Sequence, residues 1–314
     1  MDVKHIWLVL FICTTTAFQA QDPVPSYMAT VEGHLDNFNP KAALETLESA
    51  LLTNPQDMTA LLMKTDILIE MNKVKDAQEV LNKVFIVDDQ YPRAFYERGK
   101  LKYQMGQRDS AIHYLDLGLA YDPDSDTKES IYSLKGIVYM SLDKYKQAEE
   151  MLYQASRCSE VSLETMKNFA TVLYENGKLD EAVMILKETL EIFGNHLETY
   201  INTGYLCNMA HQYDEALYFS GKALEIEPDN PYAQANMALS YLRTGDLSKA
   251  IQLIDISIRN DNSNSFALRV KGECLLQMRE KARACRAFRK AIKMGYTVQH
   301  EQTEITKLMV ESCE

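Results

Sequence analysis

The chain has 314 residues, of which 46% are hydrophobic and 25% are charged. This usage is typical of a folded protein rather than a disordered one. Lys and Arg number 33 against 45 Asp and Glu, so the net charge is −12. A phosphate backbone or an anionic membrane surface requires clustered positive charge in its partner. We therefore expect no nucleic-acid partner.

The first twenty residues differ in character from the rest. Lys4 precedes an uncharged stretch over residues 6–18, whose apolar centre is shorter than the roughly 20 residues that cross a bilayer. This layout predicts a secretory signal peptide over residues 1–20, cleaved after Ala20 or, alternatively, after Ala17. A buried N-terminal helix is the other interpretation. We expect an exported protein of the periplasm, the bacterial cell envelope or the medium, with no membrane-inserted segment after signal removal.

Five cysteines follow the predicted signal: Cys158, Cys207, Cys274, Cys285 and Cys313. Their odd number and wide spacing exclude a disulfide framework and a Cys-x-x-Cys zinc site. Cys274 and Cys285 are expected on antiparallel helices near one turn, so they are the single plausible disulfide pair. The favoured alternative is that the cysteines are small buried apolar side chains.

An alanine recurs every 34 residues, with one interval of 37. The eight positions are Ala43, Ala77, Ala111, Ala148, Ala182, Ala216, Ala250 and Ala284. Twelve residues before six of them stands another small residue, namely Gly99, Gly136, Ala170, Gly204, Ala238 or Gly272. Since antiparallel helices approach closely only where side chains are small, each interval predicts one helix hairpin. Gly106, Gly177 and Gly245 are expected in the turns, where a positive φ is favoured.

This pattern resembles the tetratricopeptide repeat, from about residue 24 to residue 296. The resemblance implies an all-α, right-handed superhelical solenoid of about eight helix pairs, followed by a C-terminal capping helix over residues 297–314. The units are expected to start near residues 24, 58, 92, 129, 163, 197, 231 and 265. The fourth unit follows a three-residue insertion around residues 124–127.

Motifs for catalysis or metal binding are missing from the sequence. There is no His-Glu-x-x-His, no Gly-x-Ser-x-Gly and no phosphate loop, and the histidines are scattered over different units. The acidic run from Asp122 to Asp126 lacks the Gly and Glu of a calcium loop. It is better interpreted as a connector whose Asp or Ser caps the next helix. We expect no enzymatic activity, no cofactor and no metal.

The resemblance also implies that the first helix of each unit lines a groove that binds protein or peptide segments. The corresponding positions are Tyr96, Lys100, Tyr103, Lys167, Tyr174, Ile201, Tyr205, Tyr232, Phe266 and Arg269. Tyrosines alternating with single charges suit an extended peptide, although several tyrosines could instead pack between neighbouring units. We expect a non-enzymatic interaction scaffold. The alternative is a structural subunit or assembly factor of an envelope complex that acts through its convex or terminal surfaces. The sequence leaves the oligomeric state open.

Overall fold

The computed structural model describes residues 26–296 together with residues 306, 307, 309, 311 and 313. This part of the chain contains sixteen α-helices and no β-strand, which confirms the all-α fold and the expected number of helix pairs. The predicted signal peptide and both of its cleavage positions lie outside the described residues.

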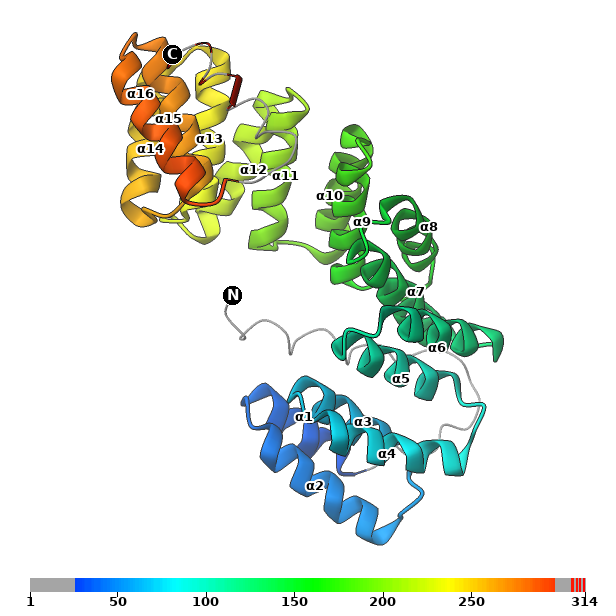
Figure 1. The fold of residues 1–314 in the computed structure, drawn as a ribbon. Helices are drawn as coiled ribbons and strands as arrows, with labels where there is room; N and C mark the ends of the chain where they lie inside the picture. The colour runs from blue at the N-terminus through cyan, green and yellow to red at the C-terminus, as the bar shows by residue number, and fades with distance from the viewer. Residues whose placement is uncertain (1–25, 297–305, 308, 310, 312, 314) are drawn as a thin grey trace. The chain divides into compact units, whose positions relative to one another are not determined.

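The helices alternate as first and second members of hairpins (Figure 1). The first helices are α1 (Met28–Asp36), α3 (Met58–Glu70), α5 (Pro92–Gln104), α7 (Ser125–Met140), α9 (Leu163–Glu175), α11 (Leu197–Met209), α13 (Pro231–Thr244) and α15 (Ser265–Gln277). The second helices are α2 (Pro40–Thr53), α4 (Val74–Val87), α6 (Arg108–Ala120), α8 (Tyr145–Ser156), α10 (Leu179–Phe193), α12 (Tyr213–Ile226), α14 (Leu247–Asn260) and α16 (Lys281–Lys293).

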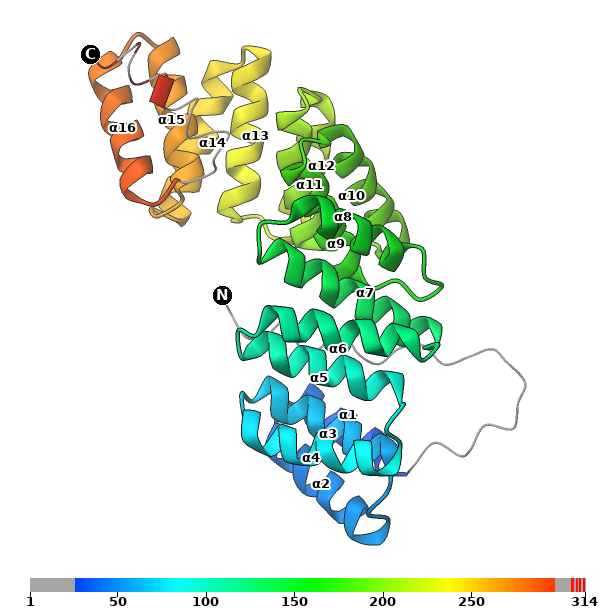
Figure 2. The same cartoon turned by 45° about the vertical axis from the view of Figure 1, so that its right-hand side comes forward.

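The chain forms two compact units, Met1–Val172 and Leu173–Glu314, and their boundary falls inside α9. In the N-terminal unit α5 contacts both α3 and α7, and in the C-terminal unit α13 contacts both α11 and α15. First helices thus pack against first helices within each unit, as the stacked hairpins show from a second direction (Figure 2). We call the surface that they form the first-helix face of that unit.

The recurring small residues are buried between the helices of each hairpin. All eight in-phase alanines have an exposed fraction of 0%. A Cβ atom added to Gly272 would lie 2.3 Å from the Phe288 ring, and one added to Gly136 would lie 2.5 Å from Leu152 Cγ. Each glycine therefore leaves room for the side chain sixteen residues later on the second helix, so the larger residue fills the space that the small one provides.

The turn between the two helices of a hairpin has a left-handed residue in every unit. Gly106, Gly177 and Gly245 have the predicted positive φ angles of 72°, 76° and 92°. The same position in the other five units is occupied by non-glycine residues with φ between 54° and 62°: Phe38, Asn72, Asp143, His211 and Arg279. The turn geometry is thus kept where its sequence signal is lost.

The three-residue insertion before the fourth unit lengthens a helix. Helix α7 begins at Ser125, four residues before the unit was expected to start, and has 16 residues. Asp124 caps it, because its side chain accepts a hydrogen bond of 2.7 Å from the backbone N–H of Thr127. The prediction that the acidic connector caps the next helix is confirmed.

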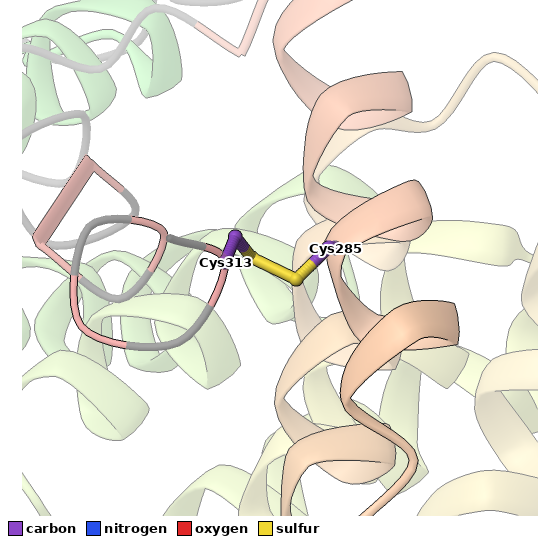
Figure 3. Close-up of a disulfide and its surroundings, with 2 residues drawn as sticks. All are labelled: Cys285 and Cys313. Atoms are coloured by element: carbon purple, nitrogen blue, oxygen red, sulfur yellow. A yellow bond between two sulfur atoms is a disulfide. The ribbon is translucent and has the colours of Figure 1, made fainter.

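The structure has one disulfide among its described cysteines, and it is not the predicted pair. Cys285 on α16 is bonded to Cys313, with 5.7 Å between their Cα atoms (Figure 3). Cys274 is free and fully buried on α15. The Cys274–Cys285 bridge that the sequence left possible is therefore not formed, and Cys274 fits the favoured interpretation of a small buried side chain. That interpretation does not hold for Cys285, which is bonded to Cys313.

The predicted C-terminal cap falls largely on residues that the structure does not describe. Its described residues, 306, 307, 309, 311 and 313, are helical. Met309 and Cys313 pack against the buried cluster of the last hairpin, which includes Leu275 and Phe288. These contacts are the ones expected of a segment that covers the apolar end of a repeat array.

Two glycine substitutions test whether the small positions are required for helix packing. Gly272→Ala should lower the free energy of unfolding by about 2 kcal/mol, because its new methyl group overlaps Phe288. Gly221→Ala, within α12, meets no atom within 4 Å and should raise it by about 0.5–1 kcal/mol. Thermal unfolding followed by circular dichroism measures both. An unchanged Gly272→Ala melting temperature would contradict the packing described above.

Candidate functional site

In the N-terminal unit the predicted groove residues of α5 share one side of the helix. Tyr96, Lys100 and Tyr103 are spaced by four and three residues, which places them on the first-helix face. Tyr96 and Tyr103 are half-buried and pack against a cluster that includes Leu134 of α7. Both tyrosines thus pack between neighbouring repeats, as one interpretation of the sequence holds, and remain partly exposed on the face expected to line the groove.

Lys100 joins two neighbouring first helices through ion pairs. Its Nζ lies 2.6 Å from Asp66 Oδ1 and 2.5 Å from Glu70 Oε1, both on α3. Burial lowers the pKa of the Lys100 ammonium, but the combined effect of its neighbours Asp66, Tyr96, Glu97 and Glu70 is larger, so the pKa is raised. Lys100 therefore stays charged and is largely engaged within the unit.

Arg93 and Glu97 continue this charged arrangement on α5. Arg93 Nε lies 3.2 Å from Glu97 Oε1, and its guanidinium carbon lies 4.7 Å from the centroid of the Tyr96 ring. Glu97 is 1% exposed, and its Oε2 is buried with no hydrogen-bond partner among the described residues. Burial, together with the charge of Asp66, raises the pKa of the Glu97 carboxyl to about 7 despite Arg93. We call Asp66, Glu70, Arg93, Glu97 and Lys100 the acid–base cluster.

Lys167 is the remaining predicted groove residue of this unit. It lies on α9, where its Nζ is 3.2 Å from Glu164 Oε2 and its side chain is 19% exposed. No contact between Lys167 and the acid–base cluster is found in the described part of the chain. The structure thus does not bring Lys167 together with the residues of α5.

The C-terminal unit brings four of its predicted residues into one group. The ring centroids of Tyr174 and Tyr205 are 6.4 Å apart, and those of Tyr205 and Phe266 are 5.6 Å apart. The guanidinium carbon of Arg269 lies 5.1 Å from the Phe266 centroid and 5.7 Å from that of Tyr296. We call these five residues the aromatic cluster. Such edge-to-face and cation–π geometries are favourable for rings and guanidinium groups.

The aromatic cluster reaches across one helix. Tyr205 belongs to α11 and Phe266 to α15, whereas α13 contacts both of these helices. On α13 the small Ala235 is fully buried and Leu239 is 1% exposed. Both residues belong to the buried cluster against which Phe266 packs, and Tyr205 and Phe266 remain half-buried on the first-helix face.

Arg269 lies deeper than the sequence pattern suggests. Only 1% of the residue is exposed, and its Nη1 pairs with Glu273 Oε1. Glu273 Oε2 also lies 2.7 Å from Arg243 Nη1 on α13. Arg269 Nε and Nη2 are buried without a hydrogen-bond partner among the described residues. Arg269 thus packs against the rings of Phe266 and Tyr296 and does not present its charge to solvent.

Ile201 and Tyr232 occupy different settings on the same face. Ile201 is half-buried, and its backbone oxygen accepts a 3.0 Å hydrogen bond from Asn236 Nδ2. Tyr232 is 49% exposed in the first turn of α13. Of the two, Tyr232 is the side chain that a partner can reach without rearrangement.

Sequence reasoning named Lys100 but missed the rest of the acid–base cluster, and it also missed Tyr296. A usable signal existed for part of the cluster, because Asp66 and Lys100 are 34 residues apart and so occupy the same position in adjacent units. Opposite charges at one repeat length predict an ion pair between neighbouring first helices. No comparable signal pointed to Tyr296, which follows the last helix.

The described residues contain no group of three or more His, Cys, Asp or Glu side chains arranged to hold a metal ion. Within the same residues, no helix has the length and apolar character that spanning a membrane requires. The chemistry available on the first-helix faces is therefore that of aromatic rings, hydroxyls and paired charges, which suits binding of polypeptide.

Family models match most of the described chain. Three models described as tetratricopeptide repeat match residues 34–96, 92–125 and 161–229, which together exceed half of the chain. A model for anaphase-promoting complex, cyclosome, subunit 3 matches residues 209–291. These matches cover parts of both units.

Curated relatives are similar at low identity. A DnaJ homolog subfamily C member 7 homolog of Dictyostelium discoideum is 24% identical over 212 residues, 63% of this chain and 39% of that protein. The human mitochondrial import receptor subunit TOM70 is 22% identical over 277 residues, 79% of this chain and 44% of that protein. The chain therefore spans less than half the length of both relatives.

Solved structures share the fold. YrrB, described as a TPR protein with an unusual peptide-binding site, is 21% identical with a TM-score of 0.54 over 61% of this chain and 97% of that chain. A chain of the APC/C hetero-tetramer Cut9–Hcn1 is 11% identical with a TM-score of 0.60 over 92% of this chain and 55% of that chain. Both support an array of helical repeats.

The raised pKa of Glu97 predicts a pH-dependent stability. The pKa of Glu97 is higher in the folded chain than its ordinary value of 4.5. Its contribution to stability is therefore fully present below pH 4.5 and is lost as the pH rises through about 7. Glu97→Gln removes the buried charge, so the variant should be more stable than the parent at pH 8. Its free energy of unfolding should be larger by on the order of 2 kcal/mol, which raises the midpoint of urea unfolding.

The gain from Glu97→Gln should shrink at pH 5, where the parent carboxyl is largely protonated. Glu79→Gln on the exposed side of α4 serves as the control and should change neither midpoint appreciably. A loss of stability in Glu97→Gln at pH 8 would show that the buried carboxylate is a net stabilising partner of Arg93.

Proposed function

The chain belongs to the tetratricopeptide repeat family, and from this premise we propose that it binds extended segments of partner proteins on its first-helix faces. The family membership supports an interaction scaffold in general. The observation that supports a particular surface is the aromatic cluster, in which Tyr174, Tyr205 and Phe266 form a continuous row. No bond is made or broken in this function, and the partner is recognised and held.

The aromatic cluster has the properties of a peptide-binding surface. Tyrosine offers a large contact area, loses little conformational entropy because it has two rotatable bonds, and carries a hydroxyl for hydrogen bonding. Contacts with neighbouring rings already hold Tyr205 in place, so binding costs less ordering. The buried Arg269 stacks under Phe266 and fixes that ring. An extended peptide that lays side chains between these rings would bury them further.

The acid–base cluster plays a different part in this proposal. Its cations are paired within the unit, since Lys100 bridges Asp66 and Glu70 and Arg93 contacts Glu97. The two Lys100 pairs join α3 to α5, whereas the Arg93–Glu97 pair lies within α5, where the Arg93 guanidinium lies over the Tyr96 ring. The cluster therefore positions the half-buried tyrosines of the N-terminal unit rather than contributing free charge.

We propose further that the protein works outside the cytosol, in a bacterial periplasm or cell envelope. Two independent features support this. Residues 1–20 have the layout of a secretory signal. The Cys285–Cys313 disulfide joins the last hairpin to residue 313, and disulfides persist mainly in oxidising compartments.

YrrB provides a precedent for peptide binding on a fold of this kind.

The test is a double substitution in the aromatic cluster. Tyr174→Ala with Tyr205→Ala should reduce the capture of partners crosslinked in the native host by at least about tenfold, because ring anchors dominate interface affinity. The matched control is Tyr153→Ala with Tyr218→Ala, which removes two exposed tyrosines from second helices. Helicity should be retained in both variants. Equal partner recovery from the two double variants would contradict the proposal.

A further inference from the structure

Helix α16 differs from the other helices in its charge. Its thirteen residues contain six basic side chains and no acidic one: Lys281, Arg283, Arg286, Arg289, Lys290 and Lys293. Its apolar residues Ala284, Cys285, Phe288 and Ala291 are buried against the last hairpin. The helix is thus anchored on one side and basic on the other.

All six basic residues are exposed. Arg286, Lys290 and Lys293 are spaced by four and three residues and so form one stripe along the helix. Among the described residues, only Arg283 has an acidic partner, Glu280. Within the part of the chain that the structure describes, the stripe is therefore a concentrated positive surface on a second helix.

The net charge of the whole chain conceals this surface. Residues 279–293 hold seven basic side chains and one acidic one, a net charge of +6 in a chain of −12. The residues after 296 hold four glutamates and one lysine, so the chain from residue 279 onward still carries +3. The expectation that overall negative charge disfavours anionic surfaces therefore does not apply to this end of the protein.

The size of the stripe restricts what it can bind. A helix of thirteen residues is about 20 Å long and about 10 Å wide, so one exposed face offers about 200 Å². A specific protein interface requires roughly 800 Å² from each partner. Exposed ion pairs contribute little without further burial. The stripe also presents no aromatic ring on which nucleic-acid bases could stack, and base stacking contributes strongly to single-strand binding.

An anionic bilayer surface requires neither a large complementary area nor a fixed geometry. It attracts each nearby Lys or Arg through its surface potential, and clusters of four to eight are typical of such binding. Ile292 and Met294 are 40% and 41% exposed at the end of the helix where Lys290 and Lys293 lie. We propose that α16 docks the protein peripherally on an anionic lipid surface, with its cations against headgroup phosphates and these two apolar side chains at the acyl boundary.

The experiment measures vesicle binding by flotation of the full chain. Vesicles contain phosphatidylcholine alone or with phosphatidylglycerol in roughly equal amount, and binding is expected only to the second kind. The neutral vesicles also account for any partition through the apolar stretch 6–18. Replacing Arg286, Arg289, Lys290 and Lys293 by Gln should weaken binding by about 100-fold or more, since each cation contributes roughly fivefold.

The matched control replaces four exposed lysines elsewhere, Lys73, Lys75, Lys83 and Lys146, by Gln and so removes the same net charge. It should bind like the parent, and added salt should weaken binding of both. Equal loss in the control and the α16 variant, or no binding of the parent to anionic vesicles, would overturn the proposal. The proposal would also be overturned if the α16 variant lost binding to an acidic peptide or to RNA but still bound anionic vesicles like the parent. Partner capture through Tyr174 and Tyr205 is a separate readout.

Discussion

The close approach of two helices at small residues is the interaction on which the rest of this structure depends. In six of the eight hairpins a glycine or alanine on the first helix leaves space for a side chain on the second, as Gly272 does for Phe288. The in-phase alanine, such as Ala284, is fully buried in the same interface. Because this contact recurs at a constant interval, each hairpin has the same geometry, and hairpins of the same geometry can stack.

Stacking places equivalent positions of neighbouring hairpins beside one another, and this determines where interactions between repeats occur. Lys100 reaches Asp66 because the two lie one repeat apart. Tyr205 contacts Phe266 two repeats away, across α13, which packs against the helices of both residues. The surfaces that we assign to binding are therefore products of the repeat interval. The basic helix α16 is different, since it is the last second helix of the array.

The sequence could predict what depends on this interval and little else. The alanines predicted the hairpins and the eightfold count, because a small residue recurring in phase indicates a repeated helix–helix contact. The left-handed turns at Phe38 and Arg279 could not be predicted from residue type, since neither residue favours positive φ. Cys313 was not recognised as the partner of Cys285, because that contact depends on the path of the chain after the last repeat. The contact of Arg269 with Tyr296 likewise could not be predicted, because Tyr296 follows the last helix and no spacing rule connects it to a groove position.

Hydrogen exchange of the backbone amides, followed by mass spectrometry, tests the central claim most directly. If small-residue packing forms each hairpin, slow exchange should recur along both helices of every unit. Fast exchange should be confined to the short turns within hairpins, around the left-handed residues from Phe38 to Arg279, and to the connectors between hairpins, each set recurring at the repeat interval. Uniformly fast exchange, or protection that follows a different period, would contradict this account of the fold.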